Sequence, residues 1–522
     1  MKKYILKYKL LNLIHIILIG FSSAFLVGAS VTLSIMLNKL VERDFKGFLI
    51  WLGIEFGVYL LFLADTYLIR VNQTKLIQKM TLSLRDDYIN SLTRKSFSEF
   101  KNKTVGEHLS ILNNDIKIIE ESGFESFYSL VSTVFTTFFS IIALFSYDYR
   151  IVLLSILLTL ILTYLPRSFA HKMEKAMKRF SIGNETFISS LTDQLLGYDT
   201  LYYSNKKEML SIKCGEVIKK FIFEKIVFIK TSSLIEIIMS LFSIISQMLV
   251  LLLTGYLIIL KQVSIGSISS VGQISGNIFN SLTTFNQLQV SISSVNIIFE
   301  KFGAFEKSSH YRYIDKDIEE IKLTNVGYSF KDKEIFKNIN CSFEKGKNYA
   351  IVGESGSGKS TLINIILGNN KQYSGSVKYN DVEISDIEES QLFKSVSYIG
   401  NITHIYHDSL RNNLTLWDNK INESEIINIL KQVNLIDLIP RLDDEVSMSF
   451  LSEGQKQRLG IARAYLTKTN VIIMDESMAN LDRDNAFLIE NQLLNDPTRM
   501  YITVSHHLQE KLLDRFHSII TL

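Results

Sequence analysis

Apolar residues are distributed very differently in the two parts of this chain. Up to about residue 300 they form long runs, and after that they form short runs interrupted by charges. A helix needs roughly 20 apolar residues to cross a bilayer. Six runs approach that length, so we predict six membrane-spanning helices, at residues 11–37, 47–69, 127–147, 150–170, 234–260 and 265–290.

The sixth run is polar for a helix surrounded by lipid. It includes Gln273, Asn277, Asn280 and Gln287, together with several serines. Because polar residues at membrane depth tend to face the interior of a helix bundle, we expect this helix to line a watery cavity. The alternative is that the segment does not span the membrane.

Positive charges orient the predicted bundle. Lysine and arginine are concentrated before the first run and in the two long connections, between the second and third runs and between the fourth and fifth. The other connections are short. The positive-inside rule therefore places the long connections and both termini in the cytoplasm.

The second part of the chain has the pattern of an α/β domain. Short β-rich segments, such as residues 348–352 and 471–474, alternate with helical patterns, such as residues 360–367 and 424–433. This alternation is typical of a largely parallel sheet covered by helices. The predicted fold is therefore a helical membrane bundle followed by an α/β domain.

Composition excludes several classes of protein. The chain is 47% hydrophobic, so it is not a disordered chain. Its net charge of +3 gives no basic excess for binding nucleic acid. Its two cysteines, Cys214 and Cys341, cannot build a disulfide framework or a cysteine-rich zinc site.

Residues 353–360 match the phosphate-binding pattern G-x-x-x-x-G-K-[ST] in full, after an apolar strand and before a helix. Lys359 is predicted to neutralise the β- and γ-phosphates, and Ser360 to bind Mg²⁺. The predicted nucleotide-binding residues of this loop are Gly353, Glu354, Ser355, Gly356, Ser357, Gly358, Lys359, Ser360 and Thr361.

A second apolar strand, residues 471–474, ends in two carboxylates. Asp475 is predicted to hold Mg²⁺, and Glu476 to act as the general base on the attacking water. Between the two motifs, residues 451–459 could form an anion-binding helix N-terminus. From the residues alone, a capped basic helix is the favoured interpretation.

Residues 451–455, LSEGQ, resemble the ABC signature motif LSGGQ. With the phosphate-binding loop and residues 471–476, they resemble the nucleotide-binding domain of an ABC transporter. Asp482 falls in the segment that matches the D-loop, and His506 matches the switch histidine. Phe330 matches the aromatic residue that stacks on adenine, with Tyr328 as the alternative.

The resemblance extends into the first part of the chain, where residues 97–115 and 184–203 are similar to the cytoplasmic loops of ABC exporters. The chain thus resembles a half-transporter, with residues 1–305 as the transmembrane domain and residues 306–522 as the nucleotide-binding domain. This implies ATP and Mg²⁺ as cofactors, and a position in the cell membrane of a bacterium, among lipids, with the ATPase domain in the cytoplasm.

The resemblance also implies a dimer, in which ATP lies between the loop of one subunit and the signature of the other. Ser452, Gly454 and Gln455 would then contact nucleotide in trans, whereas His506 would act in cis. We favour a homodimer, because both halves of the site are present in this chain. A heterodimer with a second half-transporter is the alternative.

The sequence departs from the family pattern at several positions. Asn401 replaces the usual Mg²⁺-binding glutamine, Glu453 replaces a glycine of the signature, and His507 replaces an arginine. The segment at residues 443–450 is also shorter than usual. Because the loop lysine, the Mg²⁺ carboxylate and the base remain, we expect an active ATPase.

The cargo is the least determined property. The polar sixth run favours a polar or amphipathic cargo, and the Lys-, Ile- and Asn-rich composition is similar to that of low-GC bacteria, whose compact exporters often move bacteriocin-like peptides. We therefore predict export of a peptide. A multidrug or lipid exporter is the alternative. A sensor without turnover and a soluble P-loop regulator are disfavoured by Glu476 and by the apolar runs.

Overall fold

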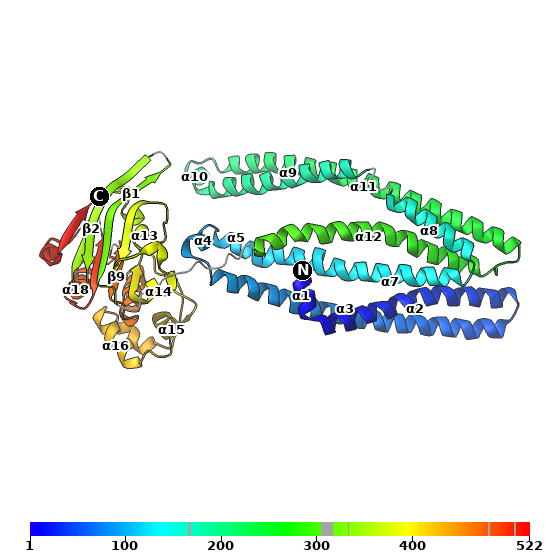
Figure 1. The fold of residues 1–522 in the computed structure, drawn as a ribbon, viewed down its shortest axis with the longest axis horizontal. Coiled ribbons are helices and arrows are strands. Elements are labelled where there is room, and N and C mark those ends of the chain that lie inside the picture. The colour runs from blue at the N-terminus through cyan, green and yellow to red at the C-terminus, as the bar shows by residue number, and fades with distance from the viewer. Residues whose placement is uncertain (165–168, 304–316, 332, 479–480, 506–507) are drawn as a thin grey trace. The chain divides into compact units, whose positions relative to one another are not determined.

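The computed structural model describes residues 1–522 except 165–168, 304–316, 332, 479–480 and 506–507 (Figure 1). The chain divides into two compact units. The first, here called the membrane unit, comprises Met1–Thr93 and Thr104–Phe305. The second, here called the nucleotide unit, comprises Arg94–Lys103 and Glu306–Leu522. The first is helical and the second is α/β, which is the predicted fold class.

The membrane unit consists of helices packed along their lengths. In chain order they are α1 (Lys2–Lys7), α2 (Lys9–Val41), α3 (Phe45–Leu92), α5 (Val105–Ser110), α6 (Ile116–Ile118), α7 (Ser126–Phe145), α8 (Tyr149–Tyr164), α9 (Ala170–Leu196), α10 (Tyr198–Tyr203), α11 (Glu208–Ile259) and α12 (Ser267–Gly303). Two π-helical segments, Ile111–Asp115 (η1) and Ile119–Glu125 (η2), join α5, α6 and α7. The long helices are continuous because the chain has only 3 prolines.

The helices differ from the six predicted spans. Among the described residues, four helical stretches are long and apolar enough to cross a membrane, namely Lys9–Val41, Phe45–Leu92, Val105–Phe145 and Glu208–Ile259. The fourth predicted run corresponds to the shorter helix α8, and part of that run lies outside the described residues. The sixth corresponds to α12, whose polar residues lower its hydropathy.

The polar residues of α12 fall into two groups. Ser267, Ser270 and Ser275 are fully buried within the unit. Ser270 accepts a hydrogen bond from Tyr147 at 2.8 Å, and Ser275 donates to the Gly272 carbonyl at 3.1 Å. These three serines are therefore packed inside the unit, and the prediction that the helix lines a watery cavity depends on its other polar residues. Exposed polar residues of this helix include Gln273, Asn280 and Gln287.

The nucleotide unit contains two larger sheets. The antiparallel sheet has the order β2-β1-β4-β5, and the parallel sheet has the order β11-β3-β10-β9-β6. The strands are β1 (Glu320–Phe330), β2 (Lys333–Glu344), β3 (Asn348–Val352), β4 (Ser374–Tyr379), β5 (Val382–Glu383), β6 (Val396–Ile399), β9 (Val471–Asp475), β10 (Met500–Val504) and β11 (Ser518–Thr521), with β7 (Asp408–Ser409) and β8 (Glu445–Val446) forming a small separate ribbon.

Helices surround these sheets. They are α4 (Phe97–Lys101), α13 (Lys359–Ile366), α14 (Glu389–Ser395), α15 (Leu410–Thr415), α16 (Glu423–Gln432), α17 (Glu453–Leu466) and α18 (Arg483–Leu494), with short 3₁₀ turns at Ile384–Asp386, Ile436–Arg441 and Glu510–Arg515. The central parallel strands β3, β9 and β10 are mainly apolar, because helices and the second sheet cover both of their faces. Ile351, Ile473 and Ile502 are fully buried.

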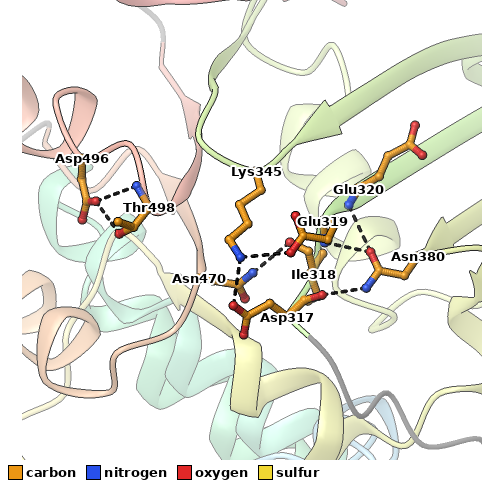
Figure 2. Close-up of polar contacts among 9 residues, drawn as sticks. All are labelled: Asp317, Ile318, Glu319, Glu320, Lys345, Asn380, Asn470, Asp496 and Thr498. Atoms are coloured by element: carbon orange, nitrogen blue, oxygen red, sulfur yellow. Dashed lines mark hydrogen bonds and ion pairs between the residues drawn. The ribbon is translucent and has the colours of Figure 1, made fainter.

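Polar side chains anchor the start of β1 (Figure 2). Asn380 accepts hydrogen bonds from the backbone of Glu319 and Glu320, at 2.8 and 3.1 Å. Lys345 pairs with Asp317 at 2.9 Å and with Glu319 at 3.0 Å. These contacts fix the start of β1 within the nucleotide unit.

Glu490, on α18, gives a testable pH dependence. Burial raises the pKa of its carboxyl from 4.5 to about 7. Between these values the folded chain binds more protons than the unfolded chain, so the free energy of unfolding falls as pH rises and levels off above about pH 7. Glu490→Gln should abolish this contribution, which is about 3 kcal/mol.

The measurement is the unfolding temperature of the purified chain at pH 5 and pH 8. We expect the variant to gain stability over the parent chain at pH 8 and much less at pH 5. Asp484→Asn, an exposed position on the same helix, is the matched control. Equal gains at both pH values would contradict the prediction.

Candidate functional site

The phosphate-binding loop connects β3 to α13 and depends on its glycines. Gly356 and Gly358 have φ values of +85° and +97°, in the left-handed region that favours glycine. A Cβ on Gly358 would lie 2.7 Å from Ile335 and 2.8 Å from Phe336. Backbone conformation and close packing therefore both require glycine at position 358.

Lys359 is held inside this loop. Its ammonium donates hydrogen bonds to the carbonyls of Gly353 and Glu354, at 2.9 and 2.8 Å. The residue is 5% exposed. Two neutral carbonyls satisfy the ammonium without cancelling its charge, so the cation remains available to an anionic ligand in the loop.

Asp475 lies at the end of β9, and its carboxylate accepts hydrogen bonds from two hydroxyl groups. Ser360 Oγ donates to Oδ1 at 3.5 Å, and the Tyr398 hydroxyl donates to Oδ2 at 3.4 Å. Burial raises the pKa of the Asp475 carboxyl, and these two hydrogen bonds oppose the rise. Hydroxyl and carboxylate oxygens are the ligands that Mg²⁺ prefers, so the donor set formed by Ser360 and Asp475 fits this ion.

Glu476 has a strained backbone. Its φ of +52° lies in the left-handed region, which is uncommon for residues other than glycine. Its backbone N–H donates to the Val504 carbonyl of β10 at 3.1 Å. This bond holds the position of Glu476 despite the strain, as is common at functional sites.

A cavity of about 400 Å³ brings most of these groups together. Its lining contains the loop, both candidate aromatic residues and the predicted base, namely Tyr328, Phe330, Ile335, Ser355, Gly356, Gly358, Lys359, Ser360, Thr361 and Glu476. Phe330, with Tyr328 as the alternative, was predicted to stack on adenine, and both residues line the cavity.

The signature residues do not line this cavity. Ser452 and Gln455 cap the start of α17: Ser452 Oγ accepts from the Gln455 N–H at 3.2 Å, and Gln455 Oε1 accepts from the Ser452 N–H at 3.0 Å. Gly454 lies between them in the first turn. Asp482 likewise caps α18, accepting from the Asn485 N–H at 3.0 Å. His506 lies outside the described residues.

Asn401, the predicted third Mg²⁺ ligand, follows β6. Its side chain is exposed and makes no hydrogen bond to the described residues, and its carbonyl accepts from Gln457 at 3.4 Å. The group that reaches Asp475 from this strand is instead Tyr398, which the sequence analysis did not single out. Gly400 leaves space for its ring, since a Cβ there would lie 3.3 Å from the Tyr398 side chain.

Glu453, the unusual acidic residue of the signature, turns back onto its own helix. It forms an ion pair of 2.7 Å with Lys456, one turn along α17. Lys456 is 7% exposed. The added negative charge is therefore neutralised within the signature helix.

Comparison with known families matches both parts of the chain. The model of the ABC transporter transmembrane region matches residues 12–282, which is more than half of the chain. The ABC transporter ATP-binding model matches residues 336–479. A model of the RsgA GTPase matches residues 269–383, an overlapping range that contains the phosphate-binding loop.

Individual relatives agree with these matches. A probable ABC transporter ATP-binding/permease protein of Haemophilus influenzae is 25% identical over 85% of this chain and 83% of its own length. A microcin-J25 export ATP-binding/permease protein of Escherichia coli is 32% identical over 36% of this chain and 34% of its own. An ATP-dependent lipid A-core flippase of Syntrophus aciditrophicus is 21% identical over 80% and 71%.

The fold is also found among solved structures. A bacterial Atm1-family ABC exporter with ATP bound superimposes with a TM-score of 0.82, covering 98% of this chain and 93% of that one, at 17% identity. This similarity confirms the predicted fold class.

The contact between Tyr398 and Asp475 predicts a change in Mg²⁺ dependence. Removing the hydroxyl in Tyr398→Phe deletes one hydrogen bond to Asp475, the predicted Mg²⁺ ligand, worth about 1 kcal/mol. We expect the Mg²⁺ concentration for half-maximal ATP hydrolysis to rise about fivefold. Asn401→Ala is the comparison, and it should change this concentration less. The reverse order would support Asn401 as the ligand.

Proposed function

The chain belongs to the ABC transporter family as an exporter-type half-transporter, and on this premise we propose that it exports a peptide from the cytoplasm. Its ATP-binding domain lies in the cytoplasm and couples ATP hydrolysis to transport across the membrane. Export of a lipid or a drug is the second candidate.

The observation that carries the peptide proposal is the exposed polar stripe of α12. Gln273, Asn280 and Gln287 are exposed and lie seven residues apart, which places them on one helix face. Amide side chains are costly against lipid tails, so a membrane helix keeps such a face for a polar environment. Backbone amides of a peptide can hydrogen-bond to these groups, whereas acyl chains cannot.

The relatives support both candidates. The microcin-J25 export protein is consistent with the first, and the lipid A-core flippase with the second. The alignment to the first covers little more than a third of this chain. The polar stripe on α12 is therefore stronger support for a peptide cargo than the similarity to either relative is for its own cargo.

We further propose that two copies of the chain form the working transporter. The cavity that contains the phosphate-binding loop has no signature residue among its lining. An anion-binding helix start at Ser452 and Gly454 would complete it from a second subunit, since the first turn of α17 offers free N–H groups and a positive dipole end. A homodimer is the simpler assembly, because one chain carries both halves.

Each residue then has a defined role in hydrolysis. Lys359 exchanges its carbonyl partners for phosphate oxygens, and Phe330 or Tyr328 packs against adenine. Glu476 accepts the proton of the attacking water as general base. Ser360 and Asp475 would hold Mg²⁺, which supplies positive charge to the phosphates when it is bound.

The test is transport into inverted membrane vesicles. We expect the parent chain to accumulate a labelled peptide with ATP and Mg²⁺, and Glu476→Gln to accumulate none. Loss of the base should lower hydrolysis about 10²- to 10⁴-fold while leaving nucleotide binding intact. ATP-driven accumulation of a hydrophobic dye, but of no peptide, would favour the second candidate.

The ion pair in the signature predicts a compensating pair of variants. Lys456→Gln would leave the charge of Glu453 unpaired close to the phosphates of the partner's nucleotide. Because Glu453 is largely exposed, the expected cost is about 0.5–1 kcal/mol, seen as a two- to fivefold rise in the KM for ATP with little change in kcat.

Glu453→Gly in the Lys456→Gln background removes the unpaired charge and should restore the KM. A KM that remains high in this double variant would mean that Lys456 acts through packing of α17 and not through charge.

A further inference from the structure

The membrane unit contains a cavity of about 540 Å³ that none of the motifs accounts for. Its volume lies within the usual range for ligand sites, about 300–1,000 Å³. It is enclosed by α2, α3 and the η2–α7 segment, and its lining consists of Ile19, Ser22, Ser23, Leu26, Phe62, Thr66, Ile69, Arg70, Gln73, Thr74, Glu125, Tyr128, Ser129, Ser132 and Thr136.

The lining residues place the cavity at the cytoplasmic end of the predicted spans. Arg70 directly follows the apolar run at residues 47–69, and Glu125 precedes the run at residues 127–147. The connection between these two runs is the cytoplasmic one, by its lysines and arginines. The charged residues therefore mark the cytoplasmic mouth, and Ser132 and Thr136 lie deeper.

The two charges at the mouth are not paired. Arg70 on α3 and Glu125 on η2 both line the cavity, yet neither forms an ion pair or a side-chain hydrogen bond with the described residues. Both residues are exposed, so each charge is accessible from the cavity and is not compensated by a protein partner. Left apart, they can each bind an opposite charge of a ligand.

Three serine hydroxyls in the lining are also free. Ser22, Ser129 and Ser132 make no side-chain hydrogen bond to the described residues. By contrast, Thr66 and Thr74 are satisfied by carbonyls of their own helix, and Tyr128 by Asn12. Free hydroxyls beside membrane-spanning helices need partners from water or from a ligand.

We propose that this cavity binds a short zwitterionic peptide segment, with its carboxylate on Arg70 and its ammonium on Glu125. The backbone amides of the ligand hydrogen-bond to Ser22, Ser129 and Ser132, and one apolar side chain packs on the wall formed by Ile19, Leu26, Phe62 and Ile69. An acyl chain would leave the hydroxyls and both charges unsatisfied. The inference rests on the proposed function, because it makes the cavity a cargo site.

The experiment tests whether Arg70 binds the carboxylate of the peptide and whether Glu125 binds its ammonium group. The chain in nanodiscs is titrated, without ATP, with a fluorescent tetrapeptide that has free termini, and with its N-acetylated and C-amidated forms. We expect each capped form to bind the parent chain about tenfold more weakly, as for the loss of one charge-assisted contact.

The variants separate the two contacts. Glu125→Gln should abolish only the preference for a free amino terminus, and Arg70→Gln only the preference for a free carboxylate. Lys75→Gln on α3 and Glu121→Gln on η2 are matched controls, since both residues are exposed and outside the cavity lining. Both preferences should persist in these controls.

Several outcomes would overturn the inference. Equal binding of all three peptide forms to the parent chain and both variants would do so. So would binding of a zwitterionic lysolipid, but of no peptide, with dependence on Arg70 and Glu125. Unaltered ATP-driven peptide uptake by the Arg70→Gln, Glu125→Gln double variant would leave the peptide-export proposal standing but exclude this cavity as the cargo site.

Discussion

The nucleotide site depends on the parallel pairing of four neighbouring strands. β10 lies between β3 and β9, and β6 lies beyond β9, all in parallel register. The carboxyl ends of these strands therefore meet at one edge of the sheet, and they deliver the phosphate-binding loop, the Asp475–Glu476 pair and Tyr398 to the same place. The bond from Glu476 to Val504 links two of these ends directly.

A different constraint governs the membrane unit. Backbone groups in lipid must be satisfied within each helix, so specificity in this unit has to come from side chains. Most polar side chains there are bonded back to a carbonyl or to a neighbouring hydroxyl, as Ser270 and Ser275 are. Exposed polar side chains in this unit are consequently informative, and they include the stripe on α12 and the two charges, Arg70 and Glu125, that line the cavity.

The sequence predicted what is encoded locally. The phosphate-binding loop and the carboxylates after β9 follow from short motifs, and the order of strands and helices follows from the apolar pattern. Tyr398 was missed because its role depends on pairing between β6 and β9 and on the absent side chain of Gly400. The direction of Glu453 was open until Lys456 could be placed one turn away. The α2–α3–α7 cavity arises from contacts between distant segments, which no single run reveals.

The segment Arg94–Lys103 belongs to the nucleotide unit, although it directly follows helix α3 of the membrane unit in sequence. Its short helix α4 has a capping box formed by Ser96 and Glu99, and the Phe97 N–H donates to Glu389 on α14 at 3.0 Å. A cavity of about 340 Å³ lies next to α4, and its lining includes Phe97, Tyr328 and Thr361.

Tyr328 and Thr361 also line the nucleotide cavity. The nucleotide cavity and the cavity at α4 therefore share two wall residues, both within the nucleotide unit. Because packed side chains resist compression, these two shared residues tie the shape of the cavity at α4 to that of the nucleotide cavity within the nucleotide unit.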